Sequence, residues 1–289
     1  MWFLRFLKSN IIYILWFVVY FTIAWFIFGA NLTSFKIVSV VYGISMSIAL
    51  SPVGEVILRF SEGCRLPATE QEKNYLLPLF EEVYKSAKQV NPSLNNGIKL
   101  YIMDAMYVNA FAIGRTTIAV TRGAVETFNS DELKGILAHE LGHMTYGHTK
   151  ALLLSNIGNF MFTVIVWISR LLLKIAQFFA ELTARMNVAG LALWIIAFMA
   201  KIYVEVIVFL FINLSEMLLS LNSRANEYEA DKFSYVIGFG KELRAGLYIL
   251  QKITMNTKVS FSERLKSTHP HTADRIARLE QLESQENRD

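Results

Sequence analysis

Long apolar stretches alternate with mixed, charged segments along the 289 residues of this chain. Residues 9–35 contain no charge, and residues 11–30 are nearly all apolar. About twenty apolar residues cross a bilayer as a helix, whereas the apolar region of a cleaved signal peptide covers only about 7–15 residues. A second uncharged stretch, residues 37–54, follows after a short loop. The two stretches predict a transmembrane helical hairpin in residues 1–60.

The basic residues around this hairpin indicate its orientation. Arg5 and Lys8 precede it, and Arg59 and Arg65 follow it. Because basic residues concentrate in cytoplasmic loops, we expect both ends of the hairpin on the cytoplasmic side.

Residues 61–150 have the composition of a water-soluble segment. Apolar spacing in residues 69–90 predicts an amphipathic helix, which Pro78 should bend or restart. Ser130 is a predicted N-cap for a helix from Asp131 to about His148. Between the two helices lie short β-like runs, at residues 98–103, 109–113 and 116–120, with Gly114 available for the turn between the last two.

A second pair of apolar stretches, residues 152–169 and 191–221, predicts another hairpin across 151–222. Lys201 and Glu205 interrupt the second stretch, and their spacing of four allows them to pair on one helical face. The connecting turn is predicted to carry Arg170, Lys174 and Arg185, which fits a non-cytoplasmic loop poorly. We therefore expect this hairpin at the membrane and leave open whether it spans.

Residues 223–289 are again polar enough to be soluble. Helical periodicity is present near residues 224–238, 241–256 and 272–283.

Composition supports a membrane protein and excludes two other classes. Hydrophobic residues make up 54% of the chain and charged residues only 18%, against about 25% charged in soluble domains. The net charge of +4 comes without a long basic run, so we expect no nucleic-acid partner and instead contact with lipid headgroups. The single cysteine, Cys64, excludes an intrachain disulfide and is interpreted as a structural residue.

The strongest chemical signal is the segment His139-Glu140-Leu141-Gly142-His143. Residues i and i+4 share a helical face, so the two imidazoles can bind one zinc ion. A bound zinc ion lowers the pKa of its water towards 7, and Glu140 beside the first ligand can then accept the proton as general base. Two histidines and one carboxylate favour zinc, although similar sets also hold iron.

A catalytic zinc site requires a third protein ligand and an open position. His148 is a local candidate, but its spacing after His143 misses the HExxHxxGxxH pattern, and we interpret it as a polar residue near the helix end. Glu227 and Asp231 share a helical face further along, while Glu229 points about 200° away from Glu227. By themselves these acidic residues are typical of a solvated helix face. The apolar hairpin between them and His143 returns the chain to the side it left, which favours Glu227 as third ligand.

At this point the chain resembles the HtpX-like membrane metallopeptidases, relatives of the CAAX prenyl endopeptidases, over residues 5–283. The matching features are the N-terminal apolar hairpin, LAHELGH followed by SRANEYEAD, the segment Asn109-Ala110-Phe111-Ala112-Ile113-Gly114, and Thr268-His269-Pro270 with Arg275.

The resemblance implies a mainly α integral membrane protein with a gluzincin-type helical peptidase domain and a small β-sheet. It implies one Zn²⁺ per chain on His139, His143 and Glu227, with Asp231 behind the ligands. His269 and Arg275 would contact substrate or the oxyanion, and extended substrate would lie along Asn109, Ala110, Phe111 and Ala112. Residues 61–150 and 223–289 would then form the two halves of the peptidase domain.

The implied function is cleavage of membrane or misfolded proteins on the cytoplasmic side of a bacterial inner membrane, as protein quality control. Processing of prenylated proteins is an alternative, although those relatives are longer. A non-catalytic membrane scaffold that keeps the fold is a second alternative, which the presence of Glu140 disfavours. A transporter using Lys201 and Glu205 would leave the HELGH segment unexplained.

Overall fold

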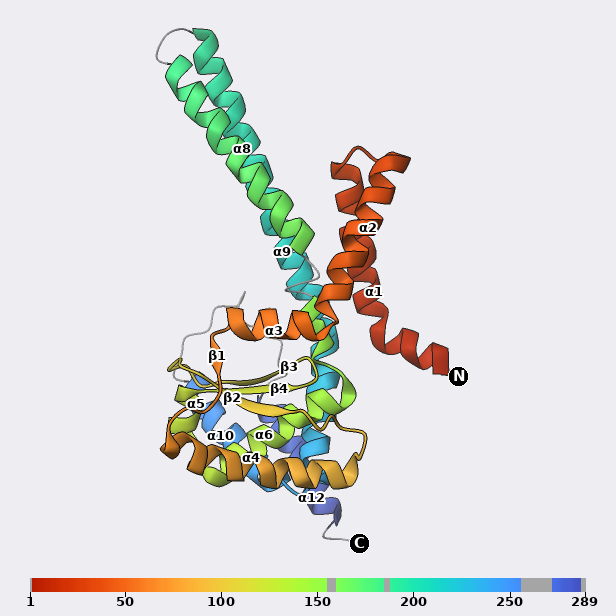
Figure 1. The fold of residues 1–289 in the computed structure, drawn as a ribbon, viewed down its shortest axis with the longest axis vertical. Coiled ribbons are helices and arrows are strands. Elements are labelled where there is room, and N and C mark those ends of the chain that lie inside the picture. Colours follow the sequence, from red (N-terminus) through yellow and green to blue (C-terminus); the bar gives the residue numbers. More distant parts are fainter. Residues whose placement is uncertain (1, 155–159, 185–187, 256–271, 287–289) are drawn as a thin grey trace. The chain divides into compact units, whose positions relative to one another are not determined.

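The computed structural model describes residues 2–154, 160–184, 188–255 and 272–286 (Figure 1). The chain is mainly α-helical with a small sheet, as predicted. The helices are α1 (Trp2–Ile27), α2 (Leu32–Ala49), α3 (Pro52–Ser61), α4 (Glu70–Val90), α5 (Arg122–Thr127), α6 (Ser130–Tyr146), α7 (Lys150–Leu153), α8 (Phe160–Ala184), α9 (Val188–Val236), α10 (Gly240–Met255) and α12 (Thr272–Glu286). The strands are β1 (Cys64–Arg65), β2 (Lys99–Met103), β3 (Ala110–Ile113) and β4 (Thr117–Thr121).

The chain divides into two compact units. Residues 1–45 and 158–218 form the first, which we call the hairpin unit. Residues 46–157 and 219–289 form the second, which we call the mixed unit. Helix α9 contributes to both, because it continues without a break through residue 222, where the sequence predicted a new segment.

In the hairpin unit, α1 and α2 contact each other through aromatic side chains. Phe21 of α1 packs against both Phe35 and Tyr42 of α2. Asn31 caps α2, since its side chain accepts a hydrogen bond from the amide of Ser34 at 2.9 Å. Helix α2 ends at Ala49, so the uncharged stretch 37–54 is not one helix, and its last residues belong to α3.

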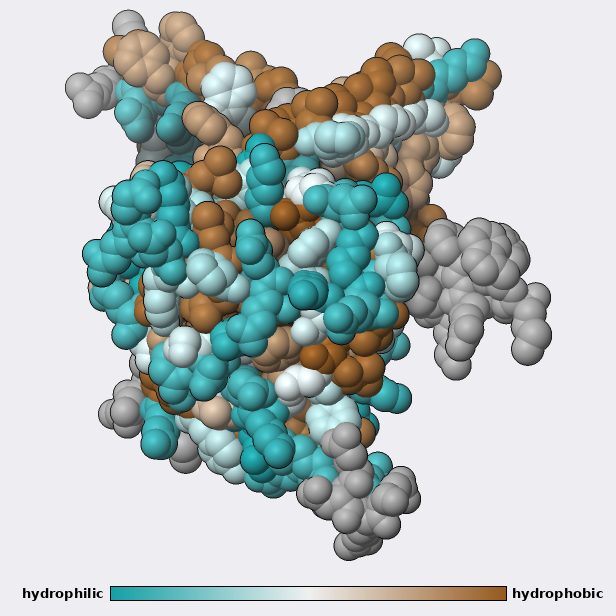
Figure 2. Space-filling model, turned by 60° about the horizontal axis from the view of Figure 1, so that its bottom comes forward, coloured by the Kyte–Doolittle hydropathy of each residue, from teal (hydrophilic) through white to brown (hydrophobic). Residues whose placement is uncertain are grey.

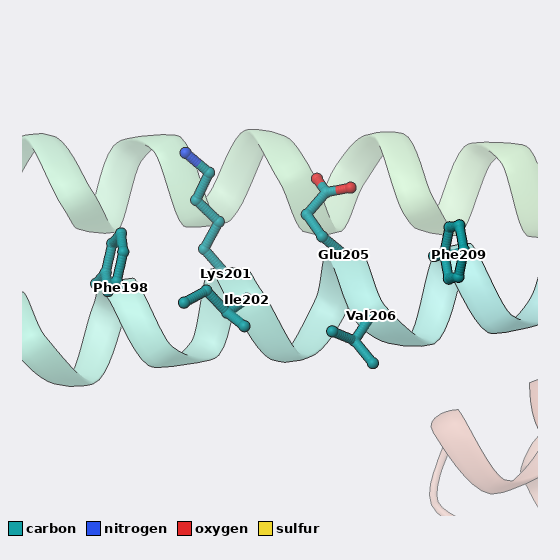
Figure 3. Close-up of a pocket in the computed structure, with 6 residues that line it drawn as sticks. All are labelled: Phe198, Lys201, Ile202, Glu205, Val206 and Phe209. Atoms are coloured by element: carbon teal, nitrogen blue, oxygen red, sulfur yellow. The ribbon is translucent and has the colours of Figure 1, made fainter.

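Among the described residues, two helices are long and apolar enough to cross a membrane, at Leu32–Ala49 and Val188–Leu210. Arg170 and Lys174 lie inside α8 rather than in the predicted turn, and Arg185 lies outside the described residues. Arg170 forms a bidentate ion pair with Glu205 of α9. Its Nε donates to Oε1 at 2.9 Å, and its Nη2 donates to Oε2 at 2.6 Å. The predicted partner of Glu205, Lys201, extends from the same groove-lining face of α9 (Figure 3). Glu205 therefore pairs with a residue of the neighbouring helix α8, and not with Lys201 on its own helix as the spacing had suggested.

The mixed unit is layered around a four-stranded sheet of order β1-β2-β4-β3 (Figure 1). Strands β2 and β4 are parallel, and β3 pairs with β4 antiparallel, so β3 lies at one edge. Helix α3 covers one side of the sheet, and α4 and α6 lie on the other. Helix α10 packs against α6, and α12 packs against α10. The two-residue strand β1 is too short for a periodicity signal and was not predicted.

Two helix boundaries differ from the sequence prediction. Helix α4 continues through Pro78, which is exposed and which removes one backbone hydrogen bond from the helix. Helix α6 begins with Asn129, not Ser130, as N-cap, because the Asn129 side chain accepts hydrogen bonds from the amides of Asp131 and Glu132. It ends at Tyr146, and Gly147 takes the left-handed conformation after it.

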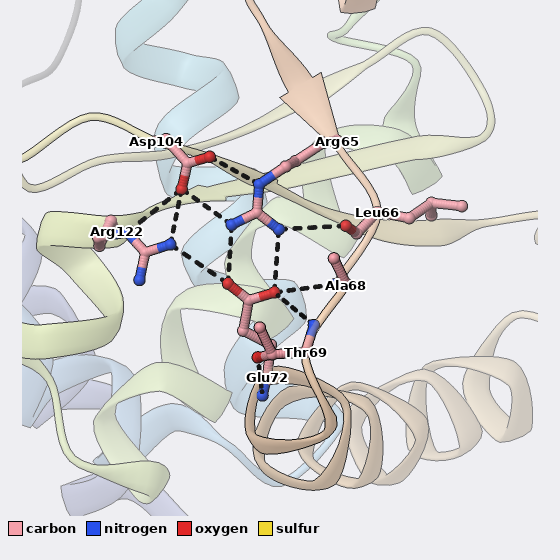
Figure 4. Close-up of polar contacts among 7 residues, drawn as sticks. All are labelled: Arg65, Leu66, Ala68, Thr69, Glu72, Asp104 and Arg122. Carbon is pink, nitrogen blue, oxygen red and sulfur yellow. Dashed lines mark hydrogen bonds and ion pairs between the residues drawn. The ribbon is translucent and has the colours of Figure 1, made fainter.

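Four charged side chains tie β1, α4, β2 and α5 together (Figure 4). Arg65 binds Glu72 at 2.7 Å and Asp104 at 2.6 Å, and Arg122 binds the same two carboxylates. Hydrogen bonds from both arginines lower the pKa of Asp104 to about 2, and those from Arg65 and the backbone of Ala68 hold the pKa of Glu72 well below its usual range. The network fixes the start of α4 against the sheet.

This network predicts a pH-dependent contribution to stability. Both carboxylates have depressed pKa values when folded, so their contribution is present above about pH 4 and is lost as pH falls towards about 2. We expect the melting temperature of wild type to exceed that of Glu72→Gln at pH 7, and the difference to shrink as pH falls from about 4 towards about 2. Thermal unfolding in detergent at a series of pH values measures this difference in melting temperature. Glu70→Gln, at an exposed pair with Lys73, is the control, and a pH-independent difference for Glu72→Gln would contradict the assignment.

Candidate metal centre

Helix α6 places two histidine rings side by side in the core of the mixed unit. His139 is buried and His143 is partly buried, and their Nε2 atoms lie 3.0 Å apart. Leu133, Leu137 and Leu141 anchor the helix, since all three are fully buried at a spacing of four. Because α6 is held on several sides, both imidazoles are directed to one fixed point.

Helix α9 brings a carboxylate to the same point. Glu227 is 3% exposed, and its Oε2 lies 3.4 Å from His139 Nε2 while its Oε1 lies 3.3 Å from His143 Nε2. The close approach depends on Gly142, where a Cβ atom would lie only 2.8 Å from the Cα of Ala230. A glycine between the two histidines therefore lets α9 cross α6 at backbone contact.

The three ligand atoms fit a single small cation. One ligand atom from each residue lies within 4.8 Å of the other two. The two Nε2 atoms are 3.0 Å apart, and a different oxygen of Glu227 approaches each of them at 3.3–3.4 Å. Tetrahedral zinc with bonds of about 2.0–2.1 Å places its ligands about 3.3 Å apart. Nitrogen and carboxylate oxygen are also the donors that zinc takes in catalytic sites. His139, His143 and Glu227 thus match a zinc ion in both chemistry and spacing.

Asp231 and Arg275 lie directly behind these groups. Asp231 Oδ1 is 2.9 Å from His139 Nδ1, so the tautomer that donates from Nδ1 leaves the Nε2 lone pair facing the ligand cluster. Arg275, buried on α12, donates from Nε and Nη2 to Asp231 at 2.8 and 2.6 Å. Its Nη1 lies 3.0 Å from Glu227 Oε2. Arg275 therefore connects Glu227 and Asp231.

The electrostatics of the cluster favour an added positive charge. Glu140, Glu227 and Asp231 are three buried carboxylates, and Arg275 is one buried cation among them. Burial and Arg275 act to lower the pKa of His139, but hydrogen bonds with Asp231 and Glu227 outweigh them and raise that pKa to about 9. Burial would raise the pKa of Asp231, but the charge of Arg275 lowers it below the ordinary value. With His139 protonated, as its raised pKa indicates, three carboxylates face two cations, and a divalent ion that displaces the His139 proton would bring the cluster to neutrality.

His148 supports His143 from the side away from the cluster. The Nδ1 atoms of the two rings are 3.1 Å apart, and His148 Nε2 lies 3.2 Å from Glu229 Oε2. Burial and the neighbouring His143 lower the pKa of His148 to about 4, so its neutral ring can accept a hydrogen bond from His143 at Nδ1 and donate one to Glu229 from Nε2. This leaves the His143 Nε2 lone pair for a metal.

The predicted general base lies beside the ligand cluster, and the predicted substrate strand packs against α6. Glu140 is buried on α6 beside His139, and its charge helps to raise the pKa of Arg275 against the effect of burial. Ala110, Phe111 and Ala112 form the edge strand β3, with Asn109 just before it, and β3 packs against α6. His269 lies outside the described residues.

Sequence reasoning did not find the roles of His148, Glu229 and Gly142. Gly147 was a usable signal, because a glycine C-cap ends α6 and turns His148 back towards His143. Gly142 was another, because a glycine inside a helix often marks close backbone approach. Glu229 carried no local signal, since it is exposed and finds His148 only through the fold.

Comparison with known proteins identifies similar sequences and one similar structure. A sequence profile for Peptidase family M48 matches residues 70–283. A protein named Protease HtpX homolog from Dictyoglomus turgidum is 28% identical, covering 97% of this chain and 91% of its own length. One of the same name from Bifidobacterium longum is also 28% identical, covering 97% and 93%. The crystal structure of Ste24p from S. mikatae has a TM-score of 0.49 at 18% identity, and this chain spans 65% of that protein.

The contact at Gly142 predicts the cost of one added methyl group. Gly142→Ala should push α9 away from α6 and lower stability by about 1–3 kcal/mol through overpacking. It should also weaken zinc binding, because Glu227 moves with α9. Chelator competition and thermal unfolding measure the two effects. Gly43→Ala in α2 is a matched control for an added methyl, because nothing lies within 4 Å of its Cβ position. Unchanged zinc affinity in Gly142→Ala would contradict the argument.

The ring contact of His148 predicts a selective effect on metal affinity. His148→Ala should reduce zinc affinity about 10–100-fold, because His143 loses the partner that fixes its tautomer. Glu229→Gln should give a smaller loss in the same direction. Lys232→Ala, on an exposed position of the same helix, should leave affinity unchanged. Equal affinities in all three variants would show that the His143–His148 contact does not support the ligand.

Proposed function

The chain belongs to peptidase family M48, and from this premise we propose that it is a zinc-dependent endopeptidase that hydrolyses proteins beside a membrane. The convergence of His139, His143 and Glu227 from two helices, with separations of 3.0–3.4 Å, carries this proposal. Acidic residues on a solvated helix face would not meet two histidines in a buried cluster.

We assign one zinc ion per chain to these three side chains. When bound, zinc would supply Lewis-acid polarisation of the scissile carbonyl and would lower the pKa of a water molecule. Asp231 holds the tautomer of His139 through Nδ1, and His148 does the same for His143. Arg275 holds Glu227 and Asp231 together. The ligand set is thus fixed before substrate arrives.

Glu140 is proposed as the general base. It accepts the proton of the attacking water and passes it to the leaving amine, so no covalent bond to the enzyme is formed. Its burial keeps the carboxylate out of bulk water and close to the ligand cluster. Because Arg275 is already engaged with Asp231 and Glu227 in this structure, we assign it a positioning role and keep His269 as the proposed donor to the oxyanion.

Substrate binding is proposed at the free edge of β3. This strand pairs with β4 on one side, and within the described residues no strand pairs with its other side. An extended peptide can add there through backbone hydrogen bonds, which do not depend on side-chain sequence. Asn109 and residues 110–112 would then contact the substrate. Such binding suits a peptidase that takes many unfolded segments.

The candidate spans support a site beside a bilayer. We propose that α1, α2 and the α8–α9 hairpin embed the chain in a bacterial inner membrane, with the mixed unit in the cytoplasm. Membrane or misfolded proteins are the proposed substrates, and protein quality control is the proposed role.

The test is Glu140→Gln purified in detergent, without a metal-binding tag. We expect one zinc per chain in wild type and in the variant, and cleavage of casein by wild type alone, because the ligands are intact but the base is missing. Metal analysis and a casein gel measure the two quantities. Casein carries no prenyl group, so its cleavage also separates this proposal from obligatory processing of prenylated proteins.

Glu126→Gln, an exposed residue of α5, serves as the control and should retain both zinc and cleavage. Absence of zinc from folded wild-type protein would overturn the metal assignment. Zinc with equal cleavage by Glu140→Gln and wild type would overturn the role of Glu140.

A further inference from the structure

Helix α3 has an apolar face that is open to the outside of the mixed unit. Val53, Val56, Ile57 and Phe60 are all exposed, and Phe60 is 86% exposed. Their spacing of i, i+3, i+4 and i+7 puts them on one stripe of the helix. Large apolar side chains clustered in this way mark a surface that binds another protein or a membrane.

The opposite face of α3 is fixed to the substrate edge of the sheet. Leu58 is buried against Ile113 of β3. Glu55, also buried, accepts hydrogen bonds from the amides of Arg115 and Thr116 at 2.9 Å each, and from the hydroxyl of Thr117 at 2.8 Å. Gly114 leaves room for this carboxylate, because a Cβ atom there would meet it. Helix α3 and the turn between β3 and β4 therefore move as one body.

The exposed stripe continues into the end of a candidate span. Helix α2 ends at Ala49, and Ile48 and Leu50 at this end are exposed as well. The side chain of Ser51 accepts from the amide of Val53 and starts α3. Gly54 packs against the carbonyl oxygens of Ile48 and Ala49, so the two helices meet without a linker. A helix that begins where a span ends starts at the lipid headgroups.

Polarity across the mixed unit agrees with this placement. The side on which α4 and α12 run is mainly hydrophilic (Figure 2), and it lies across the sheet from α3 (Figure 1). One side of the unit is therefore suited to water, and the α3 side is suited to an apolar surface.

We propose that α3 lies in the membrane–water interface, with Val53, Val56, Ile57 and Phe60 inserted among the lipids. The lipid surface is the partner because the stripe is continuous with the end of α2. A helix is about 10 Å in diameter, so β3 is held about that far from the inserted side chains. Resting on the proposed function, this assigns a substrate class: extended segments immediately next to the membrane, such as juxtamembrane segments of membrane proteins.

The first test measures lipid contact and needs no enzymatic activity. Full-length protein with Cys64→Ser receives one new cysteine, Val56→Cys or Phe60→Cys, labelled with a fluorophore and reconstituted into vesicles containing spin-labelled lipids. We expect strong quenching at both positions. Glu81→Cys on exposed α4 is the control and should show little quenching. Quenching no greater than the control would overturn the proposal, and blue-shifted emission without lipid quenching would assign the stripe to a protein instead.

The second test compares two substrates. Phe60→Glu should leave casein cleavage within about twofold, but should reduce cleavage of a vesicle-anchored peptide roughly tenfold when its cleavable segment lies close to the anchor. Phe60→Leu should behave as wild type on both. An equal loss on both substrates would reduce α3 to a structural role. No cleavage of either substrate by wild type would count against the proposed function, while the quenching result would still decide the position of α3.

Discussion

The distance between α6 and α9 controls the metal centre. Two histidines on α6 can face one point, but a third ligand must come from another helix, and carboxylate side chains are short. Gly142 allows the backbone of α9 at Ala230 to touch α6, and this contact puts Glu227 within 3.3–3.4 Å of both imidazole nitrogens. Without this crossing, α6 would be an ordinary buried helix with two polar residues.

Burying several charges together is costly, and most of them have a specific partner. Arg275 binds Glu227 and Asp231, Asp231 accepts a hydrogen bond from His139, and His148, itself in contact with Glu229, lies against His143. Asp231 and His148 also fix the orientation of the two imidazole rings. The contacts that stabilise the buried groups therefore also direct the Nε2 lone pairs of His139 and His143 towards the candidate metal position. Stability and preorganisation of the site are therefore inseparable.

The edge strand is positioned by a different part of the chain. Glu55 and Leu58 of α3 hold the β3–β4 turn, and α3 begins where α2 ends. The site is thus built between α6 and α9 on one side and a strand linked to a candidate span on the other. In the proposed peptidase, this arrangement would select substrates by their location as well as by their ability to extend.

The sequence by itself determined the elements whose signals are local. Apolar stretches indicated the helices of the hairpin unit, and the HELGH spacing indicated a metal-binding helix with Glu140 beside it. Boundaries were less certain, since Asn129 and Ser130 are both acceptable caps and only the hydrogen bonds choose between them. The apolar hairpin between His143 and Glu227 also favoured the approach of Glu227 to the two histidines, but the tertiary structure decided the other contacts between distant groups. The partner of Glu205 became Arg170 instead of Lys201, and His148 gained Glu229 as its partner, because contacts between separate helices leave no periodic trace in the chain.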